Sequence, residues 1–193
     1  MVLIRMQDVN SVKSVIEKIN IRYLCNNFNL NEIPYDVMLS EGFQPDLFGP
    51  DSNGGMECIF ELKSRTYPIR QATKRKRPKT DYEWWRADPR QISDYEQYAG
   101  KLESGLFWIF LLAHTNKQLT RTASITERTV RKREIYVVPW EVHLPSPVTD
   151  RGCVKNIGLA RIKQNYAFTR HAAKKGELFI AENIAEQVNE FFV

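Results

Sequence analysis

Two carboxylates and one ammonium group stand where they could act together. Alternation along the β-rich residues 56–62 places Glu61 and Lys63 on the same face of a strand. Asp46 lies in a preceding short strand, and a glycine-rich turn joins the two strands, so a hairpin is expected to bring its carboxylate next to Glu61. Two adjacent carboxylates repel each other unless a cation is present. A few oxygen ligands that leave positions for water and phosphate suit Mg²⁺ or Mn²⁺.

The same residues form a short signature. Pro45-Asp46 is followed fifteen residues later by Glu61-Leu62-Lys63, which resembles the PD-(D/E)XK motif of metal-dependent nucleases. The order of a helix, a hairpin, a basic segment, a second helix and a buried strand over residues 12–113 is similar to the αβββαβ core of that superfamily. The resemblance implies an α/β, restriction-endonuclease-like fold with a mixed central sheet flanked by helices, in a single nuclease domain over residues 1–193.

The resemblance also implies a role for each residue. Asp46, Glu61 and the backbone carbonyl of Leu62 would hold Mg²⁺ or Mn²⁺, which lowers the pKa of a bound water and neutralises charge on the scissile phosphate. Lys63 would orient or deprotonate the attacking water and offset charge in the transition state. Some members take a further metal ligand from a Glu on the first helix, and Glu17 is the candidate here.

Two branches of the superfamily remain open. Gln91 and Tyr95, on the helix after the motif, are similar to the Q-x-x-x-Y element of RecB-like nucleases and are expected to contact DNA. The alternative is an exposed amide for Gln91 and a core aromatic for Tyr95, which fits the apolar face of its helix. Glu-Leu-Lys-Ser-Arg, from residue 61, resembles the active-site strand of archaeal Holliday-junction resolvases. RecB-like members often have a His early in the chain, whereas His114 is the first one here. The cysteine ligands of the CRISPR-adaptation relatives have no counterpart, so no iron–sulfur cluster is expected.

The apolar pattern predicts the elements that must position these residues. Helical spacing predicts helices over residues 12–26, 88–104 and 182–192. Short β-rich runs predict strands over residues 35–39, 44–48, 56–62, 106–113 and 135–139, with a turn over residues 49–55. The run 106–113 is too apolar to be half exposed, so it is expected at the centre of the sheet. At least one of Trp84 and Trp85 is expected to pack as a hydrophobic lid.

Positive charge is concentrated in one segment. The net charge is +5, and residues 64–80 hold seven basic residues and no acidic one, so the rest of the chain sums to −2. We expect a loop insertion at about residues 64–87 that grips the DNA backbone, because a block of like charge is favoured by a polyanion; the alternatives are a solvated charge run and a localisation signal. The expected contacts are Arg65, Arg70, Lys74, Arg75, Lys76, Arg77 and Lys79. A weaker cluster follows at Arg128, Arg131, Lys132 and Arg133.

Composition limits the class of protein. The chain of 193 residues is 42% hydrophobic and 26% charged, as in a folded globular domain. No apolar run is long enough for a membrane helix and no signal peptide is recognisable, so we expect an intracellular protein that does not enter membranes. Three widely spaced cysteines argue against a disulfide framework or a zinc finger.

These features together predict a Mg²⁺-dependent deoxyribonuclease. A structure-specific endonuclease, which is expected to be a homodimer with two sites, is the first interpretation, and a RecB-like DNA exonuclease is the alternative. Two non-catalytic alternatives are a DNA-binding module that retains the fold and an RNA-binding protein with a basic arm. The sequence does not distinguish substrates within the nuclease class.

Overall fold

A computed structural model of the chain describes residues 15–34, 43–67, 84–115, 126–143 and 155–192. The strands are β1 (Asn31–Glu32), β2 (Leu47–Pro50), β3 (Met56–Tyr67), β4 (Trp84–Ala87), β5 (Gly105–Thr115), β6 (Val130–Pro139), β7 (Lys155–Gly158), β8 (Phe168–Ala173) and β9 (Gly176–Ala181). The helices are α2 (Val15–Asn27), α3 (Pro89–Leu102), α4 (Leu159–Asn165) and α5 (Ala185–Phe192), with the 3-10 turns η3 (Glu127–Thr129), η4 (Trp140–His143) and η5 (Glu182–Ile184).

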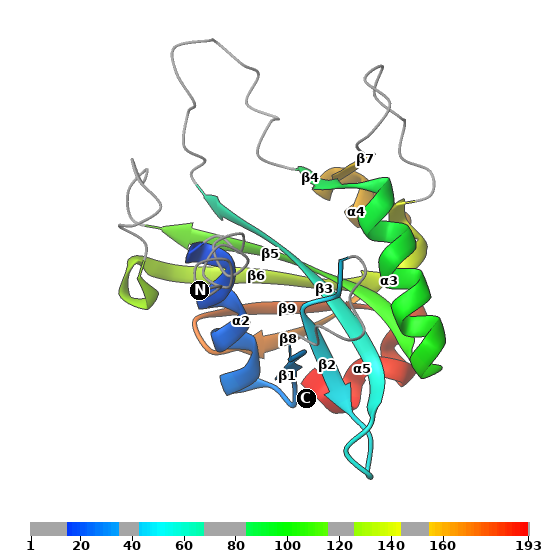
Figure 1. Cartoon of the computed structure of the whole chain (residues 1–193). Coiled ribbons are helices and arrows are strands. Elements are labelled where there is room, and N and C mark those ends of the chain that lie inside the picture. The colour runs from blue at the N-terminus through cyan, green and yellow to red at the C-terminus, as the bar shows by residue number, and fades with distance from the viewer. Residues whose placement is uncertain (1–14, 35–42, 68–83, 116–125, 144–154, 193) are drawn as a thin grey trace, which may run out of the picture.

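Seven of these strands form one mixed sheet, and helices flank it (Figure 1). The strand order is β1-β2-β3-β5-β6-β9-β8, while β4 and β7 pair as a separate antiparallel ribbon. β3 pairs with β5 in parallel, and α3 lies in the connection between them. The expected mixed α/β sheet with flanking helices is therefore confirmed. No helix in the described parts of the chain is long and apolar enough to span a membrane.

β5 and β6 occupy the middle of the core. The residues of β5 from Phe107 to Ala113 are all buried, as the uninterrupted apolar run predicts. Phe60 of β3 packs on Phe191 and Phe192 of α5, with ring centroids 6.2 and 5.5 Å apart. α5 therefore covers the face of the sheet that carries Phe60.

α3 and the β4–β7 ribbon cover the opposite face. Ala99 of α3 packs with Ile59 of β3 in one apolar cluster. Trp85 of β4 is buried against Phe110 of β5, with ring centroids 4.7 Å apart, which confirms the hydrophobic-lid interpretation for that tryptophan. Glu61 and Lys63 alternate in phase with Ile59, so their side chains belong to this face.

Local sequence explains the hairpin that carries Asp46. The Asp51 carboxylate accepts hydrogen bonds from the amides of Asn53 and Gly55, at 2.7 and 2.8 Å. Gly54 has a φ of 82°, a left-handed conformation that glycine adopts without strain. The predicted turn is confirmed, and its short length returns β3 directly beside β2.

The start of α3 is also explained by local sequence. The Asp88 side chain accepts the amide of Arg90 at 2.8 Å, and Pro89 occupies the first turn. The helix predicted from the Asp88-Pro89 pair is confirmed.

Several boundaries differ from the predicted ones. The sequence predicts a loop at about residues 64–87, but β3 continues to Tyr67 and β4 occupies Trp84–Ala87, so the prediction is wrong at both ends of that segment. Residues 68–83 and the strand expected over residues 35–39 lie outside the described residues. The sequence patterns also did not predict β7, α4, β8 and β9, which extend the sheet and its cover.

Candidate active site

Asp46 and Glu61 lie next to each other across the β2–β3 hairpin. Leu47 pairs with Phe60 in the antiparallel ladder, which brings the residue before Leu47 opposite Glu61. The Asp46 carboxylate accepts the backbone amide of Leu62 at 3.1 Å, and its own carbonyl accepts the amide of Ile33 at 3.0 Å. Both acids are buried, with 4% of Asp46 and 3% of Glu61 exposed. The predicted juxtaposition of the two carboxylates is confirmed.

Lys63 completes the cluster from the same strand. Its Nζ lies 2.6 Å from Oε1 of Glu61 and 5.8 Å from the centroid of the Trp108 ring. Its side chain is only 18% exposed. Burial lowers the pKa of Lys63, but the charges of Glu61, Asp46 and Glu17 outweigh that effect, so the pKa lies above its ordinary value. Lys63 is therefore a cation at neutral pH.

Tyr95 binds the same carboxylate from α3. Its hydroxyl donates to Oε1 of Glu61 at 3.1 Å, and its ring is buried. Of the two interpretations of Tyr95, the core aromatic is confirmed and the DNA contact is wrong, because the structure places the residue beneath the site as a partner of Glu61. Gln91 is half-buried one turn earlier on the same side of α3.

The electrostatics of the pair favour an additional cation. Burial, and after it the neighbouring charge of Asp46, raise the pKa of Glu61 to about 8, although Lys63 and Tyr95 oppose the shift. Oε2 of Glu61 is buried and, within the described parts of the chain, has no hydrogen-bond partner. A carboxylate oxygen left unpaired beside a second carboxylate is suited to a hard divalent ion, which would satisfy both groups.

Glu17 lies within electrostatic reach of this cluster. It is half-buried on α2, and its charge contributes to the raised pKa values of both Lys63 and Tyr95. For Tyr95 the larger causes are burial and the charge of Glu61. Whether Glu17 ligates a metal stays a prediction.

The described residues contain no ready-made group of three or more His, Cys, Asp and Glu side chains that could hold a metal. The metal ligands proposed here are therefore fewer than three acidic side chains. They are the carboxylates of Asp46 and Glu61 and the backbone carbonyl of Leu62, which lies next to Glu61 in β3. Such a set resembles the sparse coordination of Mg²⁺, which keeps several of its waters and binds phosphate oxygens.

The predicted basic contacts are only partly described. Arg65 is half-buried in β3, two residues beyond Lys63. The remaining six, Arg70, Lys74, Arg75, Lys76, Arg77 and Lys79, lie in residues 68–83, outside the described residues. Of the second basic cluster, Arg128, Arg131 and Lys132 are exposed. Arg133 is fully buried and pairs with Glu127, so counting it among surface cations is wrong.

Trp108 is the residue of the site that sequence reasoning missed. It is fully buried in β5, beside Glu61 in the parallel register, and its ring stacks on Trp140 at 4.2 Å. Its position depends on the register between β3 and β5, which local patterns do not specify.

Comparison of the whole chain with protein-family models, with curated proteins and with solved structures found no match.

Proposed function

We propose that this protein is a Mg²⁺- or Mn²⁺-dependent deoxyribonuclease with a restriction-endonuclease-like core. The observation that carries the proposal is the buried cluster of Asp46, Glu61 and Lys63, in which Oε2 of Glu61 has no hydrogen-bond partner among the residues that the structure describes. The parallel pairing of β3 and β5 around α3 and the mixed sheet are compatible with that core.

The residues present fit a divalent cation. Asp46, Glu61 and the Leu62 carbonyl would hold it, with Glu17 as a further candidate ligand. Bound there, the ion supplies a water of lowered pKa and positive charge beside the scissile phosphate. Because the pKa of Glu61 is about 8 without a cation, binding at neutral pH has to displace a proton from this carboxyl.

The protein side chains have distinct tasks in this proposal. Lys63 is protonated, so its Nζ acts as a fixed cation that offsets the charge developing on the phosphate rather than as the base that takes the water's proton. Tyr95 orients Glu61 through its hydroxyl, and Trp108 limits the space open to Lys63. The two carboxylates are buried and are held by α3 and by the β2–β3 hairpin.

Cleavage assays with matched acid variants test the proposal. Asp46→Asn and Glu61→Gln should each abolish hydrolysis of DNA in Mg²⁺ or Mn²⁺, and EDTA should abolish it in the wild type. Glu57→Gln is the control, because Glu57 is an exposed carboxylate on the same strand. Wild-type cleavage by either site variant would refute the assignment.

The choice of substrate separates the branches of the proposal. Supercoiled circular, circular single-stranded, linear and four-way-junction DNA should be offered in parallel. Cleavage of circles or junctions indicates an endonuclease, and a junction-specific enzyme should have the mass of a homodimer by light scattering. Cleavage restricted to ends indicates the RecB-like exonuclease. Metal-independent binding without cleavage of any DNA would favour a non-catalytic module.

A further inference from the structure

We propose that the exposed cations of α2, of the η3–β6 segment and of the β8–β9 turn form a preorganised surface that binds the backbone of duplex DNA beside the site. The inference rests on the proposed function and assigns the element of the molecule that grips the substrate. We call this the α2–β6 basic surface; its members are Lys18, Arg22, Arg128, Arg131, Lys174 and Lys175, all exposed.

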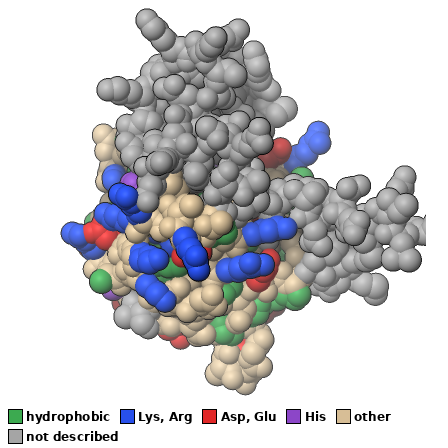
Figure 2. All heavy atoms as spheres, turned by 90° about the vertical axis from the view of Figure 1, so that its left-hand side faces the viewer, with side chains coloured by type: hydrophobic (Ala, Val, Ile, Leu, Met, Phe, Trp, Pro, Cys, Tyr) green, Lys and Arg blue, Asp and Glu red, His purple; other side chains and the backbone are tan. Residues whose placement is uncertain are grey.

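The three elements lie together at one end of the molecule, at the left of Figure 1. Figure 2 shows this end directly: Lys and Arg side chains gather over its middle and outnumber the acidic ones. Outside residues 64–80 the chain has a net charge of −2, so an even distribution of charge would not produce a basic face here. Positive charge is concentrated at this end by the fold.

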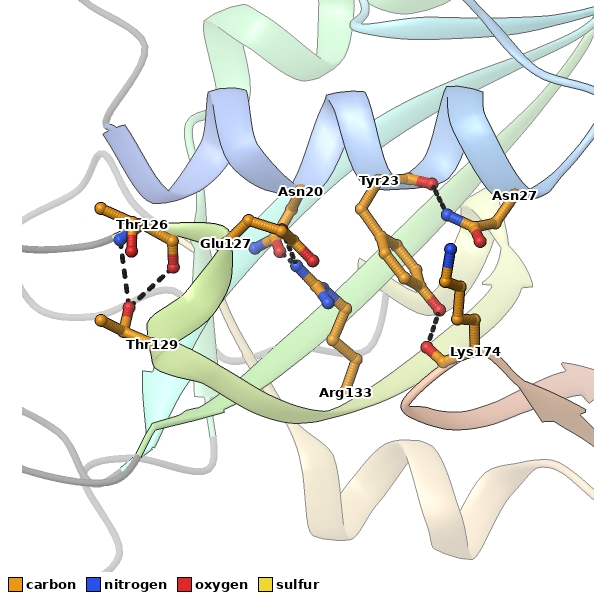
Figure 3. A network of polar contacts seen from close by, with 8 residues as sticks. All are labelled: Asn20, Tyr23, Asn27, Thr126, Glu127, Thr129, Arg133 and Lys174. Carbon is orange, nitrogen blue, oxygen red and sulfur yellow. Dashed lines mark hydrogen bonds and ion pairs between the residues drawn. The ribbon is translucent and has the colours of Figure 1, made fainter.

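A buried network holds the three elements in fixed positions (Figure 3). Nε of Arg133, on β6, donates to Oδ1 of Asn20 on α2 at 3.1 Å, and its guanidinium lies 3.9 Å from the centroid of the Tyr23 ring. Nη2 of Arg133 pairs with Glu127 of η3 at 2.7 Å. The same arginine therefore joins the helix to both parts of the η3–β6 segment.

Tyr23 and Arg133 also hold the β8–β9 turn. The Tyr23 hydroxyl donates to the carbonyl of Lys174 at 2.6 Å, and the amide of Arg133 donates to the carbonyl of Lys175 at 2.9 Å. A Cβ at Gly176 would clash with the carbonyl oxygen of Arg133, so glycine permits this close approach. The backbones that carry the exposed cations cannot move independently.

Fixed cations suit a rigid polyanion. A duplex presents phosphates at regular intervals, and cations that are already positioned lose less conformational entropy on binding than those of a flexible chain. Lys18 and Arg22 are one helical turn apart on the exposed side of α2. Glu17, next to Lys18 on α2, contributes to the electrostatics of Lys63.

Salt titrations of duplex binding test the inference. The background is the Glu61→Gln variant, in EDTA, so that binding is measured without cleavage. Two double variants, Lys18→Gln/Arg22→Gln and Arg131→Gln/Lys174→Gln, each remove two surface cations. Each should flatten the slope of log K against log salt by about 1–2, because each lost phosphate contact contributes about 0.9. Lys101→Gln/Lys163→Gln is the control with equal charge loss, because both lysines are exposed on other elements.

Each outcome decides the inference independently of catalysis. Slopes that change in both test variants and not in the control support it, even if the wild type cleaves no DNA. Slopes equal to the control refute it, even if the wild type is an active nuclease, and so does failure of the Glu61→Gln protein to bind duplex DNA. If the two test variants lost affinity for duplex RNA but kept their affinity for duplex DNA, that result would also refute the inference.

Discussion

Glu61 determines how the stability of the protein depends on pH in the absence of a metal. The folded state keeps a proton on this carboxyl up to about pH 8, whereas the unfolded chain loses it near 4.5, the ordinary pKa. The folded state therefore binds more protons within that window, and its stability falls as the pH rises through it. The loss is on the order of a few kcal/mol.

Thermal unfolding in EDTA measures this effect. The wild-type melting temperature should fall from pH 5 to pH 8, and Glu61→Gln should show a flatter profile, because its side chain does not titrate. Glu57→Gln, on the exposed side of the same strand, should follow the wild type. Parallel profiles for wild type and Glu61→Gln would contradict the protonation of Glu61. Mg²⁺ should raise the wild-type melting temperature most at the alkaline end.

Lys63 gives a second prediction at the scale of a single residue. A fixed cation that acts on the transition state contributes to turnover more than to ground-state binding. Lys63→Ala should therefore lower kcat by about 100-fold or more while DNA affinity stays within about twofold. Single-turnover cleavage and equilibrium binding measure the two quantities, and Lys63→Arg should keep part of the activity. An equal loss of affinity and turnover would make Lys63 a binding residue only.

At the scale of the elements, the position of Asp46 depends on how closely β2 approaches α5. A Cβ at Gly49 would lie 2.5 Å from the Phe191 ring, so Gly49→Ala forces the strand and the helix apart. Overpacking of this kind costs about 1–3 kcal/mol. Denaturant unfolding should show that loss, and cleavage should fall as well, because Gly49 is three residues from Asp46.

Gly100→Ala is the matched control for this change. Gly100 lies in α3, and a Cβ there meets nothing within 4 Å. The free energy of unfolding should rise by about 0.5–1 kcal/mol, since alanine favours the helix. Destabilisation by both changes, or by neither, would contradict the packing seen at Gly49.

The elements near the site were predictable because their signals are local. The Asp88-Pro89 cap, the Asp51 turn and the apolar run of β5 each depend on neighbouring residues, and each is confirmed. The role of Tyr95 was missed because its bond to Glu61 depends on how α3 packs on the sheet. A tyrosine at this spacing in a helix gives the same sequence pattern whether its hydroxyl contacts DNA or a buried carboxylate.

Burial of Arg133 could not be read from the sequence for a similar reason. In a run of basic residues it is indistinguishable from Arg131 and Lys132, yet strand alternation turns it inward beneath α2. Its partners Asn20 and Glu127 are separated from it by 113 and 6 residues. Only the packing of α2 on β6 reveals which arginine holds the structure together and which ones face solvent.

At the scale of the whole molecule, the two proposed functions occupy different parts of one sheet. The acids lie in the β2–β3 hairpin under α3, and the α2–β6 basic surface lies at the end where α2 crosses β6 (Figure 1). α2 joins them, because Glu17 acts on Lys63 while Lys18 and Arg22 face outward.

The order of the elements along the chain has a consequence during synthesis. Every proposed catalytic side chain has been made once α3 is complete, but the turn that anchors Tyr23 and Arg133 is made only with Lys174 and Lys175. β9, which pairs with β6, comes later still. Because a chain emerges from the ribosome from its N-terminus, a nascent protein would contain Asp46, Glu61 and Lys63 before it contained the turn that completes the α2–β6 basic surface.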